Sequence, residues 1–219
     1  MNVLLTIFAA ASLTNVFPQI ARHERYSFAG SNALAAQLQQ GAPADVFASA
    51  NTAIASRLYH ERVVERPVVF TRNELIVIVP RSNPAHIHSV ADLARPGVKV
   101  VVAAPGVPVG DYTRTVLKNM NESRVLQNVV SNETDVREVL AKVALGEADA
   151  GFVYTTDART VRGKVATIGI RRSAQPRVSY AVAVVRSSKH KAAARAWVKR
   201  LLGKAAQRKL RAAGFLPRR

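Results

Sequence analysis

Two serines stand where apolar runs give way to expected helices. Ser12 follows the apolar run at residues 3–8 and three alanines, and Ser31 follows the run at residues 25–29 and a glycine. At such a strand-to-helix turn the first backbone N–H groups have no partner within the helix, and the helix dipole favours negative charge. The serine hydroxyl adds one more donor at the same point. This combination of residues predicts a binding site for an anion.

Both serines also have plainer interpretations, which the residues alone leave open. Serine is a common N-cap, so either hydroxyl could serve its own helix and nothing else. The start of the chain could be a secretory signal peptide, because apolar residues and an Ala-x-Ala spacing follow Met1. However, no Lys or Arg precedes Arg22 and the apolar run is short. We therefore interpret residues 3–8 as a strand of the fold and expect a chain without a signal peptide.

The elements that position these serines alternate between strand and helix. Strands are expected at residues 3–8, 25–29 and 46–48, followed by helices at 13–21, 31–40 and 51–60. Buried apolar runs support the strands, and apolar residues spaced three and four apart support the first helix. Three strand–helix units in succession are typical of a parallel α/β sheet. Both serine turns would then face one crevice, at the carboxyl ends of the strands, where open α/β sheets bind ligands.

The rest of the chain predicts a second α/β lobe. Further strands are expected at residues 74–80, 98–103, 125–130, 148–153, 165–170 and 178–185, with helices at 89–94, 111–120 and 134–145. The last strand shares the character of the early ones, which indicates that the chain returns to its first sheet. We therefore predict lobe 1 from residues 1–79 and 180–219 and lobe 2 from residues 80–179. Two crossovers, near Val79 and Ser179, would join the lobes with a ligand cleft between them.

Composition narrows the class of protein. The chain has 219 residues, of which 48% are hydrophobic, and it has no cysteine. That is enough apolar sequence for a globular core, and it excludes disulfides, thiolate metal ligands and a cysteine nucleophile. No apolar run approaches the roughly 20 residues of a membrane-spanning helix.

The charge of the chain is strongly positive. The formal net charge is +18, from 32 Lys and Arg against 14 Asp and Glu. Such a charge makes nucleic acid, anionic lipid or an anionic ligand a candidate partner. Twelve of the basic residues lie in residues 186–219, which contain no acid. Ala194, Trp197 and Leu201 share one side of an expected helix there, so we interpret its basic residues as a solvated face.

An enzyme and a nucleic-acid-binding protein are two competing functions. None of the five histidines lies in a strand-exit turn, where a nucleophile and its base would be expected. His86 and His88 are spaced as a metal pair, but no third ligand is near, so a surface loop is favoured. No helix-turn-helix or zinc knuckle is recognisable, and only 6% of the residues are aromatic. We expect neither catalysis nor nucleic-acid binding.

Six segments, in order along almost the whole chain, carry a family resemblance. They are Phe8-Ala-Ala-Ala-Ser-Leu-Thr-Asn15, Ser27-Phe-Ala-Gly-Ser31, Gly41-Ala-Pro-Ala-Asp-Val-Phe47, Val107-Pro-Val-Gly110, Asp135-Val-Arg137 and Gly151-Phe-Val-Tyr-Thr-Thr-Asp157. Together they resemble the periplasmic molybdate-binding proteins of ABC importers, the ModA family. The resemblance implies a type II periplasmic binding protein fold, whose two lobes close over one tetrahedral oxyanion, molybdate or tungstate.

The same resemblance implies partners and a set of ligand contacts. It implies a monomer without a cofactor, located in the periplasm or otherwise outside the cytoplasmic membrane, that delivers its oxyanion to the permease and ATPase subunits of an ABC transporter. The implied oxyanion contacts are the hydroxyls and amides of Ser12 and Ser31, the amides of Val109 and Val136, and the hydroxyl of Tyr154. This set contains no cation and no metal ligand, so neutral donors would hold the dianion.

Two departures from the family pattern affect the expected site. The turn Gly30-Ser31-Asn32 is less rich in serine than the family's turn, and Val109 stands where a smaller residue was expected. Within the same fold, two alternatives stay open: a binding protein for another oxyanion such as sulfate or phosphate, and a ligand-sensing domain without a transport role.

Overall fold

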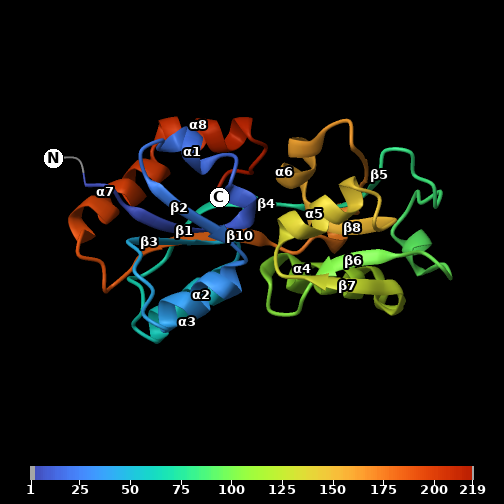
Figure 1. The fold of residues 1–219 in the computed structure, drawn as a ribbon, viewed down its shortest axis with the longest axis horizontal. Coiled ribbons are helices and arrows are strands. Elements are labelled where there is room, and N and C mark those ends of the chain that lie inside the picture. The colour runs from blue at the N-terminus through green and yellow to red at the C-terminus, as the bar shows by residue number, and fades with distance from the viewer. Residues whose placement is uncertain (1–2, 219) are drawn as a thin grey trace. The chain divides into compact units, whose positions relative to one another are not determined.

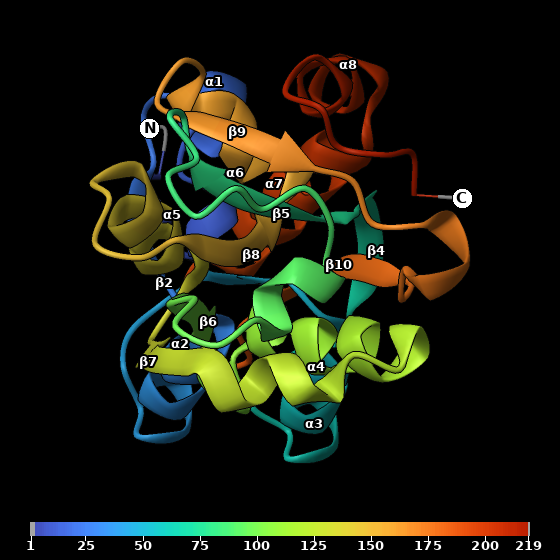
Figure 2. The ribbon, with the colours of Figure 1, turned by 90° about the vertical axis from the view of Figure 1, so that its right-hand side faces the viewer.

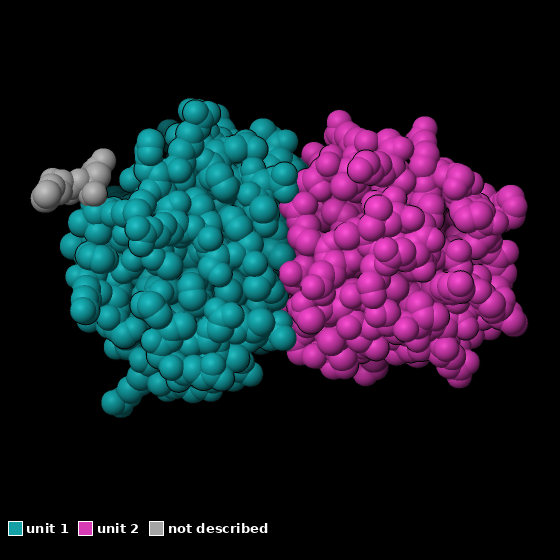
Figure 3. Space-filling model, viewed as in Figure 1, with its two compact units in different colours: residues 1–73, 178–219 teal, residues 74–177 magenta. Residues whose placement is uncertain are grey.

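Two five-stranded sheets organise the chain, and each belongs to its own unit. The structure is a computed structural model that describes residues 3–218. Unit 1 consists of Met1–Asn73 and Val178–Arg219, and unit 2 of Glu74–Arg177 (Figure 3). Helices flank the sheet of each unit (Figure 1). The predicted α/β fold with two lobes is confirmed.

The sheet of unit 1 has the order β2-β1-β3-β10-β4. Its strands are β1 (Thr6–Ala10), β2 (Arg25–Ala29), β3 (Val46–Ser49), β4 (Val68–Asn73) and β10 (Val178–Val184). The first three run parallel, whereas β10 pairs antiparallel with both β3 and β4. The sheet is therefore mixed, and the late strand β10 returns to the early half of the chain, as expected.

Helices cover both faces of this sheet (Figure 1). They are α1 (Phe17–Ile20), α2 (Ser31–Gln39), α3 (Thr52–His60), α7 (Lys191–Leu202) and α8 (Lys204–Ala212). On the face of α2 and α3, Leu34 and Leu58 pack with Phe47 of β3 in one buried cluster. On the face of α7, the rings of Phe17 and Trp197 lie 5.4 Å apart. Two apolar layers thus hold the strands whose ends carry Ser12 and Ser31.

The sheet of unit 2 has the order β7-β6-β8-β5-β9, which Figure 2 shows from the side of this unit. Its strands are β5 (Leu75–Pro80), β6 (Val100–Ala103), β7 (Val129–Glu133), β8 (Ala150–Tyr154) and β9 (Val165–Ile168). Its α-helices are α4 (Pro108–Met120), α5 (Val136–Ala144) and α6 (Thr155–Ala158), and short 3₁₀ helices occupy Ala91–Ala94, Ser123–Asn128, Arg159–Val161 and Arg172–Ala174. Because β6, β7 and β8 run parallel, their carboxyl ends share one edge of the sheet.

Several expected elements differ from the structure. The expected helix at residues 13–21 is wrong: a 3₁₀ helix at Ala11–Leu13 is followed by a turn and the short helix α1. Pro18 explains the break, because it has no N–H to donate to the preceding turn and its ring clashes with the backbone there. The expected basic helix near the end of the chain is two helices, divided at Gly203.

Two further differences concern strands. The strand expected at residues 125–130 is wrong: residues up to Asn128 form a 3₁₀ helix, and β7 begins at Val129. Only Val125 of that 3₁₀ helix is buried, so the segment lacks the repeated buried positions of a core strand. Strand β4 was not predicted, because only three apolar residues, Val68 to Phe70, precede its polar end.

Candidate functional site

Ser12 lies at the carboxyl end of β1, in the 3₁₀ helix Ala11–Leu13. Its side chain is buried, and its Oγ lies 2.9 Å from the hydroxyl of Tyr180 on β10. The Nδ2 of Asn73 donates to the same tyrosine hydroxyl at 3.4 Å. The serine makes no capping hydrogen bond to its own helix. The N-cap interpretation is therefore wrong for Ser12, whose hydroxyl instead contacts Tyr180 of β10.

Ser31 is the first residue of α2, with Gly30 as the N-cap residue. Its Oγ accepts a hydrogen bond from the backbone N–H of Ala50 at 3.0 Å, and it does not cap its helix. A hydroxyl that accepts this bond keeps its own proton to donate. The first amides of α2 also lack acceptors within the helix. Ser31 therefore presents donors at a fixed place beside the end of β3.

The two serines lie at the same edge of the unit 1 sheet. Strands β1 and β2 are parallel neighbours, and Ala10 is in register with Ala29. Ser12 and Ser31 each follow these residues by two positions, so the structure brings them to the same edge. Both side chains are buried, with 4% and 1% of their surface exposed. Buried donors need an acceptor, and an anion that enters at this edge can accept hydrogen bonds from both serines.

Val109 lies in the first turn of α4, after Pro108. A Cβ added to the next residue, Gly110, would lie 2.3 Å from the carbonyl oxygen of Ala104 and 2.4 Å from that of Ala103. Arg114 further ties the helix to β6, because its Nη1 donates to the carbonyls of Ala103 and Gly110 at 3.0 and 2.9 Å. The start of α4 thus packs directly on the end of β6, and the first amides of the helix are held at the edge of the sheet.

Val136 is the first residue of α5, and its N-cap is Asp135. The Asp135 carboxylate accepts from the amides of Arg137 and Glu138 at 2.6 and 3.3 Å. The cap therefore takes the second and third amides of the helix and leaves that of Val136 for another acceptor. Burial raises the pKa of Asp135, whereas the two amide bonds lower it.

Tyr154 ends β8 and directly precedes α6. Its side chain is only 1% exposed. Three residues on, Asp157 is fully buried and forms an ion pair with Arg137, whose Nε lies 3.1 Å from Asp157 Oδ1. Burial raises the pKa of Asp157 to about 7, while the Arg137 guanidinium and the backbone of Tyr154 act in the opposite direction. This pair links the starts of α5 and α6.

The donors of unit 2 lie at one edge of its sheet. Val109 follows β6, Val136 follows β7 and Tyr154 ends β8. These three strands are parallel, and Ala103 of β6 is in register with Glu133 of β7. The structure therefore brings the two amides and the phenol to the shared carboxyl edge of unit 2, as it brings the two serines to that of unit 1.

The Asp135 cap and the Arg137–Asp157 pair were not identified from the sequence. Asp135 could have been, because an Asp three residues before Glu138, just ahead of apolar helical spacing, is an N-terminal helix signature. The ion pair could not, because its partners are 20 positions apart (157 − 137) and only the packing of α5 on α6 joins them.

Other kinds of site are not evident in the described part of the chain. Residues 3–218 contain no group of three or more His, Asp or Glu side chains placed to hold a metal ion. Within the same residues, no helix has the length and apolar character needed to cross a bilayer. The chemistry of the candidate site is therefore that of neutral hydroxyl and amide donors, which suits an acceptor-rich, fully deprotonated ligand.

Comparisons with known proteins identify a family and a fold. The family model for bacterial extracellular solute-binding proteins matches residues 5–216. The chain is 39% identical to the molybdate-binding protein ModA of Mycobacterium tuberculosis, over 96% of this chain and 84% of that protein. It is 31% identical to the molybdate-binding protein ModA of Haemophilus influenzae, over 96% of this chain and 89% of the relative. The solved structure of the periplasmic molybdate-binding protein of Azotobacter vinelandii has the same fold, with a TM-score of 0.84, 20% identity, and coverage of 97% of this chain and 98% of that one.

Proposed function

The chain belongs to the ModA family of bacterial extracellular solute-binding proteins, and from this premise we propose that it binds molybdate and delivers it to an ABC transporter. It is a transport protein and not an enzyme. The single observation that carries the proposal is the gathering of neutral donors at the carboxyl edge of each sheet, with both serine hydroxyls buried and neither used as a helix cap.

We assign the oxyanion contacts to five residues. In unit 1 these are Ser12 and Ser31, through their hydroxyls and amides. In unit 2 these are the amides of Val109 and Val136 and the hydroxyl of Tyr154. Each amide belongs to the first turn of a helix, where the dipole favours negative charge. Hydrogen bonds to an ionised acceptor are stronger than neutral ones, and stronger still where water is excluded, so a dianion needs no cationic residue here.

A set of donors without acceptors also selects among anions. Molybdate and tungstate are fully deprotonated tetrahedral dianions, so each of their oxygens can only accept. Hydrogen phosphate carries a proton that would face another donor, and an unpaired donor of this kind costs about 1–3 kcal/mol. Tungstate, which has the same shape and charge, is therefore proposed as a second ligand. Sulfate shares the charge as well, and discrimination against it would rest on cavity size.

The remaining proposals concern the setting of this function. The family places the protein in the periplasm or the extracellular space. We propose that the chain acts as a monomer and needs no cofactor, because the five donors bind the oxyanion directly. Its partners are the membrane components of the ABC transporter, for which we propose a permease and an ATPase subunit.

Thermal unfolding of dialysed protein tests the function. Molybdate, tungstate, sulfate and phosphate are added in turn at constant ionic strength. A ligand at 100 times its Kd stabilises the folded state by about 2.7 kcal/mol, which raises the midpoint by about 5–10 °C in a chain of this size. We expect this rise with molybdate and tungstate only. Equal rises with all four anions would indicate binding to the basic surface and would contradict the proposal.

A further inference from the structure

Four exposed cations of unit 1 lie near the amino ends of the strands whose carboxyl ends precede the two serines. Ser12 and Ser31 lie at the carboxyl ends of β1 and β2, whereas Thr6 and Arg25 pair at the amino ends of the same strands. Around these amino ends the surface carries Arg22, Arg25, Lys189 and Arg200, all exposed. We name this region, together with Val3 and Leu4, the amino-edge surface. None of its cations contributes to the oxyanion site.

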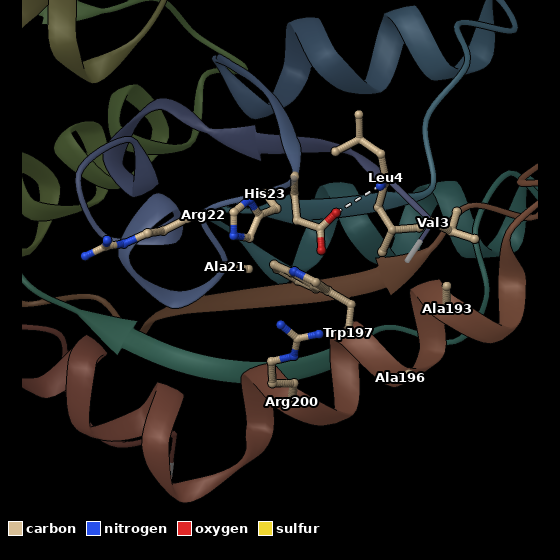
Figure 4. A pocket seen from close by; sticks show the side chains of 11 residues that line it. Val3, Leu4, Ala21, Arg22, His23, Ala193, Ala196, Trp197 and Arg200 are labelled. Atoms are coloured by element: carbon tan, nitrogen blue, oxygen red, sulfur yellow. Dashed lines mark hydrogen bonds between the residues drawn. The ribbon is translucent and has the colours of Figure 1, made fainter. Parts of the chain in front are cut away.

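A first hollow opens in the amino-edge surface, between the start of the chain and α7 (Figure 4). It has a volume of about 380 Å³ and is lined by Arg22 and Arg200, by Glu24, and by apolar residues that include Leu4 and Ala196. Figure 4 shows Trp197 and Arg200 projecting from α7 on the same side, with His23 across from them. The volume lies within the roughly 300–1,000 Å³ typical of ligand pockets, and its cations suit an anionic group joined to an apolar body.

Trp197 forms part of the floor of this hollow. The residue is 1% exposed and lines the hollow. Its Nε1 is itself buried, so the N–H is not open to a ligand in the hollow. The indole therefore adds apolar surface beside the exposed Arg200.

A second hollow adjoins the first and shares Leu4 with it. Its volume is about 400 Å³, and its lining includes Arg25, Lys189 and His190. Leu4 therefore stands between two hollows that both carry exposed cations. Val3 and Leu4 are themselves exposed, at 43% and 44%, so two neighbouring apolar side chains lie beside these cations.

Two acidic residues of this region, Glu24 and Asp45, accept hydrogen bonds from groups of the protein itself. The Oε2 of Glu24 accepts from the amide of Leu5 at 2.9 Å. Asp45 accepts from the amide of Thr6 at 2.8 Å and from the hydroxyl of Ser188. These two carboxylates hold the amino ends of the strands, and they are fewer than the exposed cations around them. The local field of the amino-edge surface is therefore positive.

We propose that the amino-edge surface docks the protein on an anionic phospholipid bilayer. Arg22, Arg25, Lys189 and Arg200 attract the lipid phosphates, and a headgroup occupies the hollow above Trp197. Val3 and Leu4 enter the interface between headgroups and acyl chains. Apolar side chains beside clustered cations are the features that bind peripheral proteins to such membranes.

This docking leaves the oxyanion donors of unit 1 away from the lipid. The donors follow the carboxyl ends of β1 and β2, and the docking surface surrounds the amino ends of those strands. The inference goes beyond the transport function and does not depend on which oxyanion is bound. Failure of one can therefore be distinguished from failure of the other, because lipid binding and molybdate binding are measured separately.

Flotation with lipid vesicles tests the docking. The full chain is mixed with vesicles of phosphatidylcholine alone, or of phosphatidylcholine with phosphatidylglycerol, at physiological ionic strength. We expect flotation only with phosphatidylglycerol, and weaker flotation as salt rises, because salt screens exposed charges.

Arg22→Gln with Arg200→Gln should weaken the partition by about 25-fold, since each basic residue near an anionic surface contributes about fivefold, or ~1 kcal/mol. Leu4→Ser should weaken it at all salt concentrations.

The matched control removes the same charge elsewhere. Arg162→Gln with Arg172→Gln changes two exposed arginines of unit 2, and this variant should float like the wild type. All variants should keep the wild-type thermal unfolding midpoint without added ligand, which shows that they are folded. Equal loss in both double variants would show that only net charge matters and would overturn the assigned surface. Flotation with phosphatidylcholine alone, or none with either vesicle, would overturn the proposal outright.

Discussion

Arg137 and Asp157 form an ion pair across unit 2, with Nε 3.1 Å from Oδ1. The Asp157 side chain is completely buried and the Arg137 side chain is 26% exposed. Val136 directly precedes Arg137, and Tyr154 lies three residues before Asp157. The pair thus connects the helix start that carries one proposed donor to the turn that carries another. The pair does not itself belong to the proposed ligand contacts.

The pair should make stability depend on pH. Burial raises the pKa of Asp157 from 3.8 to about 7, so between these values the folded protein holds this proton more tightly than the unfolded chain does. The contribution of Asp157 to the free energy of unfolding is therefore full below about pH 4 and declines as pH rises toward 7. Denaturant unfolding from pH 4 to 8 should show this decline in the wild type and a flatter profile in Asp157→Asn. Glu147→Gln, at an exposed carboxylate, should follow the wild type. A parallel profile for Asp157→Asn would contradict the shifted pKa.

The serine hydroxyl should matter more than its protein partner. Ser12→Ala removes one donor to an ionised ligand, which is worth about 1.5–3 kcal/mol, so molybdate affinity should fall by about 10- to 100-fold. Tyr180→Phe removes only the hydroxyl that lies 2.9 Å from Ser12 Oγ, and it should cost affinity less. Thr115→Ala, at an exposed threonine, is the control. Unchanged affinity in Ser12→Ala would remove this serine from the site.

The start of α4 should tolerate no side chain at Gly110. A methyl group there would lie within 2.4 Å of two backbone oxygens, so Gly110→Ala must displace the helix from β6 and with it the Val109 amide. We expect a loss of stability of about 1–3 kcal/mol, as for other overpacked sites, and weaker molybdate binding. Gly169→Ala is the matched control, because nothing lies within 4 Å of its added Cβ. Equal unfolding midpoints for Gly110→Ala and Gly169→Ala would contradict the close packing of Gly110 on the backbone of Ala103 and Ala104.

The Asp135 cap should be replaceable by asparagine and not by alanine. Asp135→Ala leaves the amides of Arg137 and Glu138 without their acceptor and should destabilise the protein by about 1 kcal/mol. Asparagine caps helices about as well as aspartate does, so Asp135→Asn should keep both the stability of the protein and its molybdate affinity. Loss of molybdate affinity in Asp135→Ala alone would support the use of the Val136 amide. Equal loss in both variants would instead implicate the charge of Asp135.

The serine positions were predictable because local sequence determines them. An apolar strand, small residues and a serine before a helix recur at Ser12 and Ser31, and the structure has β1 and β2 ending at these points. The amides of Val109 and Val136 carry no such signal, since a backbone donor leaves the residue type undefined. Only the family resemblance named them, and their use as ligand contacts stays a prediction.

The elements that escaped prediction depend on tertiary packing. Strand β4 has few apolar residues, and it is a strand because β10 pairs with it along its length. Residues 123–128 carry apolar residues but adopt a 3₁₀ helix that buries Val125 alone. The Arg137–Asp157 pair depends in the same way on two helices that approach only after folding. Local propensity is a weak guide at such places, because long-range contacts override it.

Calorimetric titration of molybdate into the wild type and into Ser12→Ala with Ser31→Ala tests the central claim most directly. A repeat titration in the presence of excess sulfate distinguishes a selective site from general anion binding. The account predicts one molybdate per chain, little competition by sulfate, and an affinity in the double variant at least about 100-fold lower, because two donors to an ionised ligand are lost. Wild-type affinity in the double variant, or full displacement by sulfate, would contradict it.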